Sequence, residues 1–276
     1  MIQEAIAPAT IRLPLLRIGV SRGLLEIKQF FRARDSVIFM FALPILFMII
    51  FGAIFGRQRL GPDHTYSQAL VPALMTFSIL STGLVNIGVW IVLDRENGTL
   101  RRLTTTPMPG AAYFFGKVVM VLVIGLISLS TLVAIGVLLY GVKLPTAPDK
   151  LLTIVWVTLL GYTTLGVLGV AMSSLVTHGR SASAVMNLPS LVLAFISGVF
   201  IRYTDIPPWM YGFASLFPVK WIAQGLRSGF LPDSLARLEA SGAWQRDRVF
   251  LVLLAWLIVG VVLCMTTFRW RREGDG

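Results

Sequence analysis

The stretch that decides the fold is Val118–Gly141, which reads VVMVLVIGLISLSTLVAIGVLLYG and contains no charged residue and no histidine. A helix needs about 20 apolar residues to cross the roughly 30 Å hydrocarbon layer of a bilayer. Five further stretches have the same length and character: Val37–Gly56, Ala69–Leu93, Leu151–Val176, Ala184–Ile201 and Val249–Phe268. The sequence therefore predicts an all-α polytopic membrane protein with six transmembrane helices.

The composition agrees with a membrane protein and excludes a soluble enzyme. Of 276 residues, 56% are hydrophobic and only 13% are charged, whereas soluble domains carry about 25% charged residues. The formal net charge is +11. In a membrane protein, basic residues gather in cytoplasmic segments and against anionic lipid head groups. We therefore expect membrane lipid, and not nucleic acid, as the partner of this charge.

The distribution of basic residues predicts the orientation. Six spans put both ends of the chain on one side. Residues 1–36 carry six basic residues against three acids, and residues 269–276 add three arginines. The positive-inside rule then places both termini in the cytoplasm. The chain divides into a cytoplasmic segment 1–36, a transmembrane domain 37–268 and a cytoplasmic tail 269–276.

One segment before the first span has a helical pattern of its own. Between Val20 and Phe31, apolar residues recur at helical spacing and polar residues are turned away from them. The apolar positions are Val20, Leu24, Ile27 and Phe31, and the polar positions are Arg22, Glu26 and Gln29. This pattern predicts an interfacial helix on the cytoplasmic leaflet. A plain solvated helix is the alternative.

A second segment, 206–230, precedes the last span. It is rich in Trp and Phe, and prolines interrupt it at 207, 208 and 218, so its apolar runs are too short to cross a bilayer. We expect short re-entrant half-helices at the outer interface, with Trp209, Pro218 and Trp221 shaping an outer lid. Lys220 is expected to be an interfacial anchor, although a contact with an anionic head group at an exit is the alternative.

The sequence lacks the groups of residues that catalysis or metal binding requires. The sequence shows no carboxylate pair, no Ser/His/Asp set and no metal-ligand cluster where a site would form. Cys264 is the single cysteine, and His64 and His178 fall in different predicted loops. The spans contain no ionisable residue at membrane depth, which disfavours ion-coupled transport. We expect neither catalysis nor a metal in this chain.

The most informative loop is 94–110, DRENGTLRRLTTTPMPG, between the second and third spans. Gly98 breaks the preceding helix, Thr99 is able to cap a new one, and prolines at 107 and 109 stop it. Leu100 and Leu103 share one face of that short helix, with two arginines beside them. Such a helix suits docking into a groove on a soluble partner. A solvated loop would explain the charges but not the paired leucines.

This loop resembles the signature of ATP-binding-cassette (ABC) type-2 permeases, the membrane subunits of bacterial exporters such as the daunorubicin-resistance type. The matching pattern is Arg95-Glu96-x-Gly98-Thr99-Leu100-x-x-Leu103-x-x-Thr106-Pro107. The outer segment resembles the same family through Pro207-Pro208-Trp209, Phe217-Pro218-Val219-Lys220-Trp221 and Gly225-Leu226-Arg227. The resemblance covers essentially the whole chain.

The resemblance implies a location in the inner membrane of a bacterium and a mechanism. Two permeases, alike or different, pair with two copies of a separate ATPase subunit that binds ATP and Mg, so this chain itself holds no cofactor. The implied ATPase-coupling residues are Arg95, Glu96, Gly98, Thr99, Leu100, Leu103 and Thr106. Arg95 and Glu96 are further expected to hold the loop to the interfacial helix through ion pairs. The implied cargo is hydrophobic or amphiphilic, a drug, an antibiotic or a lipid, moved outward.

Two polar stripes are candidates for the substrate path. They consist of Ser78, Thr82 and Asn86 in the second span and of Asn187, Ser190 and Ser197 in the fifth. Polar groups in lipid need partners, so the stripes line a path or form helix–helix hydrogen bonds. Trp90 and Phe77 would add apolar contacts. The rival functions are a non-pore anchor or regulatory subunit for an ATPase, and an ATP-independent channel, which has no use for a coupling loop.

Overall fold

The protein is almost entirely helical in a computed structural model, which describes residues 15–61, 64–106, 108–176, 178–200 and 206–267. The helices follow one another along the chain with short connections. They are α1 (Leu15–Arg32), α2 (Arg34–Phe55), α3 (Tyr66–Ile79), η1 (Leu80–Asn86), α4 (Ile87–Glu96), α5 (Thr99–Thr104), α6 (Gly110–Tyr140), α7 (Pro148–Ser173), α8 (Gly179–Ile196), α9 (Pro208–Ala214), α10 (Pro218–Phe230), η3 (Asp233–Leu238) and α11 (Arg246–Thr267).

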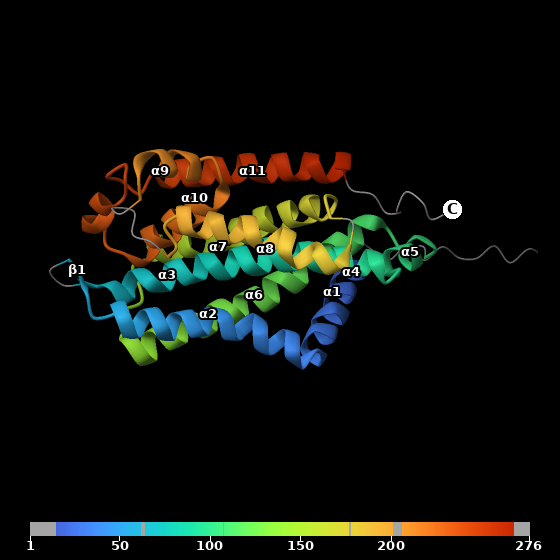
Figure 1. The fold of residues 1–276 in the computed structure, drawn as a ribbon, viewed down its shortest axis with the longest axis horizontal. Helices are drawn as coiled ribbons and strands as arrows, with labels where there is room; N and C mark the ends of the chain where they lie inside the picture. The colour runs from blue at the N-terminus through green and yellow to red at the C-terminus, as the bar shows by residue number, and fades with distance from the viewer. Residues whose placement is uncertain (1–14, 62–63, 107, 177, 201–205, 268–276) are drawn as a thin grey trace, which may run out of the picture.

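Six of the described helical segments are long and apolar enough to cross a membrane, which confirms the predicted fold class. They are α2, the continuous α3–η1–α4, α6, α7, α8 and α11. Figure 1 shows them side by side along the long axis of the molecule, with α5 at one end and β1 at the other. These ends are called the α5 end and the β1 end below. At the latter, β1 (Arg59–Gly61) and β2 (His64–Thr65) form an antiparallel hairpin that the sequence did not predict.

The ends of the spans differ from the predicted ones mainly in α6 and α8. Helix α6 begins at Gly110, directly after Pro109, and so includes Lys117, which the prediction left in the loop. Its first turns pack on α1, and the charge of Lys117 is paired there, as described below. Helix α8 begins at Gly179 and ends at Ile196. The predicted ends at 201 and 268 lie outside the described residues.

The second span forms the centre of the bundle and is not a regular α-helix. Its middle part, η1, is a π-helix of 7 residues between α3 and α4. Side chains such as Leu74, Ile79 and Ile91 are completely buried. Helix α7 lies so close to η1 that a Cβ added at Gly169 would come within 2.6 Å of the Leu84 carbonyl oxygen. Glycine is therefore needed at this helix crossing.

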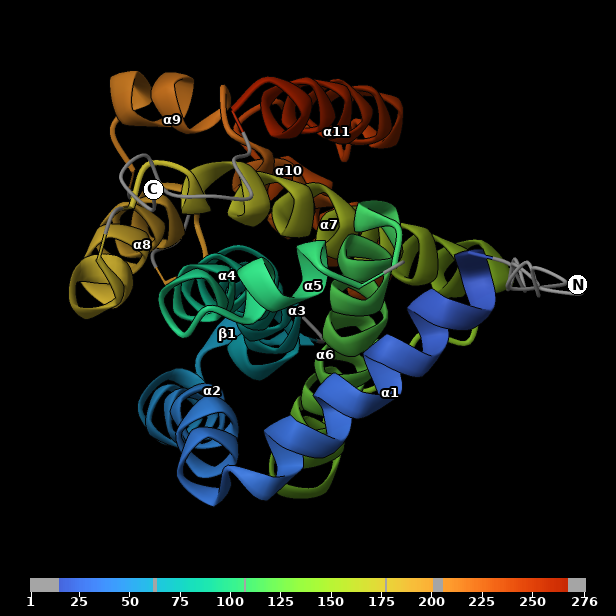
Figure 2. The ribbon, with the colours of Figure 1, turned by 90° about the vertical axis from the view of Figure 1, so that its right-hand side faces the viewer.

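Helix α1 lies across α6 at the α5 end, as Figure 2 shows. The contact uses small residues of α1: Gly19 faces Phe115, and Gly23 faces Val119. The apolar side chains of Val20, Leu24 and Phe31 are exposed on the outer side. The predicted helix is thus present. Three of its four predicted apolar positions are turned away from the protein, as lipid contact requires, whereas Ile27 packs against the cluster around Phe30.

The predicted outer segment forms two short helices that begin at prolines. Helix α9 begins at Pro208 and α10 at Pro218, the position where a missing N–H costs nothing. Helix α10 is buried over its whole length against α7, α3 and α11. It is part of the core at the β1 end.

Candidate functional site

The chain turns from the second span into α5 at a single glycine, Gly98. Gly98 adopts φ 71°, the left-handed region that favours glycine, and it directly precedes α5. Thr99 is therefore the first residue of the helix, and the predicted capping by its side chain is wrong, because the N-cap position belongs to Gly98. At the other end, the Thr106 hydroxyl donates to the carbonyl of Leu103 at 2.7 Å, which closes the last turn.

The leucines of α5 hold the helix to the body of this chain. Leu100 is 1% exposed and belongs to the main hydrophobic core, and Leu103 packs against that core. The bundle itself therefore covers the leucines of the helix that the sequence predicted to suit a groove on a partner. The exposed side of α5 carries Arg101 and Arg102 instead.

Arg95 and Glu96 connect the end of the second span to α7 and α8. The Arg95 guanidinium donates to the carbonyls of Ser173 at 3.0 Å and Val176 at 3.5 Å, at the end of α7. The exposed Glu96 carboxylate lies against Gly179, the first residue of α8. A negative charge is favourable at such a helix start. Glu96 thus reaches α8, whereas the sequence predicted an ion pair between Glu96 and the interfacial helix α1.

The contact with α1 is made by a buried ion cluster centred on Lys117 of α6. The Lys117 ammonium lies 2.8 Å from Oε2 of Glu26 in α1 and 2.8 Å from Oδ2 of Asp94 in α4. The Tyr113 hydroxyl donates to the same Asp94 oxygen at 2.8 Å. On the other side, Arg22 pairs with Oε1 of Glu26 at 3.0 Å. Two cations and two anions therefore join three helices at the α5 end.

The sequence alone did not predict this cluster. The helical pattern correctly places Glu26 on a face turned away from the apolar residues, but that face packs on α6 and the carboxylate is buried. In the sequence, Lys117 only precedes an apolar run. One signal was available: a lysine at the start of a span and an acid on a neighbouring amphipathic helix both need a partner when they are buried.

The three polar residues of the second span do not share one side. Ser78 is buried and shares a 2.9 Å hydrogen bond with Ser128 of α6. Thr82 is also buried, whereas Asn86 lines a cavity beside α2. Ser78 thus faces α6, whereas Asn86 faces α2. Ser78 therefore serves helix packing, and Asn86 faces open space.

The residues of the fifth span also diverge. The Ser190 hydroxyl is buried and donates to the carbonyl of Met186, one turn back in α8. Ser197 is buried just after the helix. Asn187 is exposed, and its amide donates to the carbonyl of Ser183. The expected single stripe is thus wrong, because Asn187 points outward while the two serines point inward.

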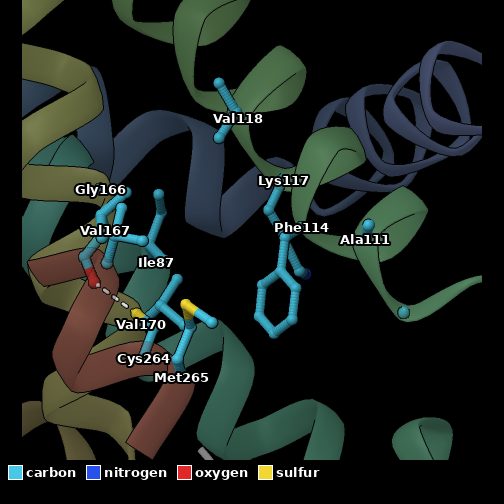
Figure 3. A pocket seen from close by; sticks show the side chains of 12 residues that line it. Ile87, Ala111, Phe114, Lys117, Val118, Gly166, Val167, Val170, Cys264 and Met265 are labelled. Carbon is cyan, nitrogen blue, oxygen red and sulfur yellow. Dashed lines mark hydrogen bonds between the residues drawn. The ribbon is translucent and has the colours of Figure 1, made fainter. Parts of the chain in front are cut away.

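Two cavities lie near the ion cluster. The smaller, about 260 Å³, contains Asn86 and Ser81 of η1 and Trp90 of α4, facing Pro44 and Leu43 of α2. The larger, about 470 Å³, lies between α4, α6, α7 and α11. Figure 3 shows Phe114 and Lys117 of α6 on one side of it, and Val170 and Met265 on the other. Both volumes are close to or within the range of small-molecule sites.

Residues 24–231 match the family described as ABC-2 type transporter. The chain belongs to the ABC-2 type transporter family. Members of this family are the membrane subunits of ABC transporters and not enzymes. This permease is 26% identical over 220 residues to the inner membrane transport permease YadH of Escherichia coli K12, covering 78% of this chain and 83% of YadH. It is 22% identical over 191 residues to the probable multidrug ABC transporter permease YbhR of the same organism, covering 68% of this chain and 50% of YbhR.

At the β1 end of the permease, the predicted lid residues lie in different environments. Trp209 of α9 is 72% exposed. Pro218 is the buried first residue of α10, and Trp221 one turn later is buried with its indole N–H donating to the carbonyl of Ser215 at 2.8 Å. Trp221 and Pro218 therefore fix α10 in place, and Trp209 is the residue of this group that a lid could present to the outside.

Lys220 of the permease is not the interfacial anchor that the sequence predicted. It is fully buried, and its ammonium lies 3.5 Å from the ring centre of Trp221 and 5.0 Å from that of Tyr211. Burial lowers the pKa of Lys220 to about 8, against the opposing effect of Glu239. Glu239 is buried too, and its carboxylate pairs with Arg227 of α10 at 2.6 Å.

The described part of the permease holds no group of three or more His, Cys, Asp or Glu residues that could bind a metal ion. Buried ion pairs lie within it at the α5 end around Lys117 and at the β1 end around Arg227. Their arrangement is suited to holding helices together and transmitting movement between them.

Proposed function

We propose that this permease is the membrane-spanning subunit of an ATP-driven exporter in the inner membrane of a bacterium. A separate ATPase subunit, which binds ATP and Mg, docks at the α5 end. Both termini and α5 then face the cytoplasm, and the β1 end with α9 and α10 faces outward. The cargo is a hydrophobic or amphiphilic compound, such as a drug, an antibiotic or a lipid.

The observation that carries this proposal is the way α5 is attached. Leu100 anchors α5 in the core, and only two residues separate α5 from α4. Asp94 of α4 is bonded through Lys117 to Glu26 of α1. A force applied to α5 is thus passed to the second span, to α6 and to α1 together. This is the connection that a subunit driven by an external ATPase needs.

The nature of the cargo is supported by the two cavities. The larger one is lined by apolar side chains, with Lys117 at its edge. The smaller one adds the amide of Asn86 and the indole of Trp90, so it offers both apolar and polar contacts. The name of the relative YbhR, a probable multidrug permease, agrees with a cargo of this kind.

A second permease, either another copy or a homologous chain, completes the transporter in this proposal. Helices α2 and α8 expose apolar side chains along most of their length, among them Phe39, Ile54, Leu188 and Val192. In a bilayer such faces are covered by lipid or by another helix bundle. The cavity with Asn86 lies beside α2, so a partner on this side would close it.

The test is a gentle-detergent purification of the tagged permease with the stoichiometry of the co-eluting chains. An ATPase at one copy per permease, and transport by the reconstituted complex, are the expected results. If the permease elutes alone as a stable oligomer, the coupling role of α5 is wrong and an ATP-independent channel takes its place. An ATPase complex that transports nothing would instead favour a membrane anchor.

The substrate path is tested by Asn86→Leu, with Asn187→Leu as the matched control. Asn86 lines the smaller cavity, whereas Asn187 is exposed on α8. We expect Asn86→Leu to change export while the amount of folded permease in the membrane stays the same, and Asn187→Leu to leave both unchanged. Loss of folded protein in Asn86→Leu would assign the amide to helix packing.

A further inference from the structure

The exposed side of α5 carries positive charge. With 3.6 residues per turn, Leu100 and Leu103 share one side of this helix, and Arg101 and Arg102 point away from it. The leucine side packs on the core, and both arginines are exposed. The surface that α5 offers to any partner is therefore its arginine side and not its apolar side.

The acidic residues of the same loop are turned elsewhere. Asp94 is engaged by Lys117 and by the Tyr113 hydroxyl, on the side of α6. Glu96 lies against Gly179 at the start of α8. Arg102 donates to the carbonyl of Asn97 at 3.1 Å, which holds its guanidinium on the outer side of the loop. The basic character of the α5 surface is thus built into the fold of the loop.

The position of α5 favours a protein partner over lipid head groups. Leu24 and Phe31 of α1 are exposed apolar side chains, so α1 marks the level of the membrane surface. In Figure 1, α5 lies beyond α1 at the very end of the bundle. The arginine side of α5 therefore projects past the level at which lipid is expected.

We propose that the groove of the ATPase that receives α5 is acidic, with Asp or Glu side chains that pair with Arg101 and Arg102. This inference rests on the proposed function and adds the chemistry of the partner. A guanidinium pairs with a carboxylate in a fixed two-pronged geometry. Complementary charges across an interface select the partner and speed association. The two arginines thus determine which ATPase this permease accepts.

The test uses the ATPase isolated from the wild-type complex and the full-length permease in nanodiscs of zwitterionic lipid. The dissociation constant is measured at increasing NaCl concentration. The variant is Arg101→Glu/Arg102→Glu, and the matched control is Arg32→Glu/Arg34→Glu, two exposed arginines where α1 meets α2. We expect the first variant to bind roughly tenfold or more weakly and to lose most of the salt dependence. The control should bind like the wild type.

The outcomes separate this inference from the proposed function. Wild-type affinity and salt dependence in Arg101→Glu/Arg102→Glu would overturn the acidic groove and leave the proposed function standing. Purification of the wild-type permease without any ATPase would overturn both. Weaker binding that appears only in nanodiscs with anionic lipid would assign the arginines to head groups, and the inference would be wrong. Restoration of binding by an Asp→Arg or Glu→Arg change in the ATPase groove would establish the pairing.

Discussion

Replacing Lys117 with methionine removes the centre of the ion cluster at the α5 end. The change keeps the side chain's length and deletes the ammonium that lies 2.8 Å from both Glu26 and Asp94. Removing one partner of a buried ion pair costs about 3–5 kcal/mol. Glu26 keeps its pairing with Arg22, and the Asp94 side chain is 23% exposed. We therefore expect a loss of about 3 kcal/mol, the lower end of that range.

The loss is measured as a change in melting temperature of the purified permease in detergent. For a chain of this size, about 3 kcal/mol corresponds to roughly 6–12 °C. The matched control is Lys143→Met, which removes the same charge from an exposed position after α6. Equal melting temperatures for Lys117→Met and Lys143→Met would refute the reasoning, because the buried pair would then contribute nothing.

The double variant Lys117→Met/Asp94→Asn separates the ion pair from simple packing. Asparagine removes the unpaired negative charge and can still accept the hydrogen bond from Tyr113. The double variant should lose less stability than the sum of the single variants, by about 1–2 kcal/mol. In the assembled transporter, Lys117→Met should also lower transport per ATP hydrolysed more than Lys143→Met does. Strictly additive losses would show that Lys117 and Asp94 act independently.

The helices were predictable from the sequence because a transmembrane span is a local property. A run of about 20 apolar residues is visible in the sequence without knowledge of its packing partners. Gly98 and the prolines at 208 and 218 mark helix boundaries through their own backbone geometry. Hence the six spans, α5 and the two short outer helices were all expected near their observed places.

The candidate site was less predictable because it depends on contacts between distant residues. An amphipathic pattern shows that Leu100 and Leu103 share a side, but not whether the partner or the chain itself covers that side. Lys117 is brought to Glu26 only by the packing of α1 on α6. The sequence did not predict the π-helix η1, which interrupts the second span.

The remaining predictions concern α5 and the outer helices. Leu100→Ala should cost about 3 kcal/mol and weaken ATPase binding, with Leu138→Ala, exposed on α6, as the control. Trp221→Ala should cost about 3–5 kcal/mol, whereas Trp209→Ala should change stability by no more than about 0.5 kcal/mol, measured by thermal melts. The burial of Lys220 predicts that the stability of the permease depends on pH. Because its pKa falls from 10.5 to about 8 on folding, the folded state binds fewer protons than the unfolded state between these values. The free energy of unfolding should therefore rise with pH across this window, by roughly 3 kcal/mol. Lys220→Met should remove this rise, and an unchanged slope in the variant would show that another group titrates there.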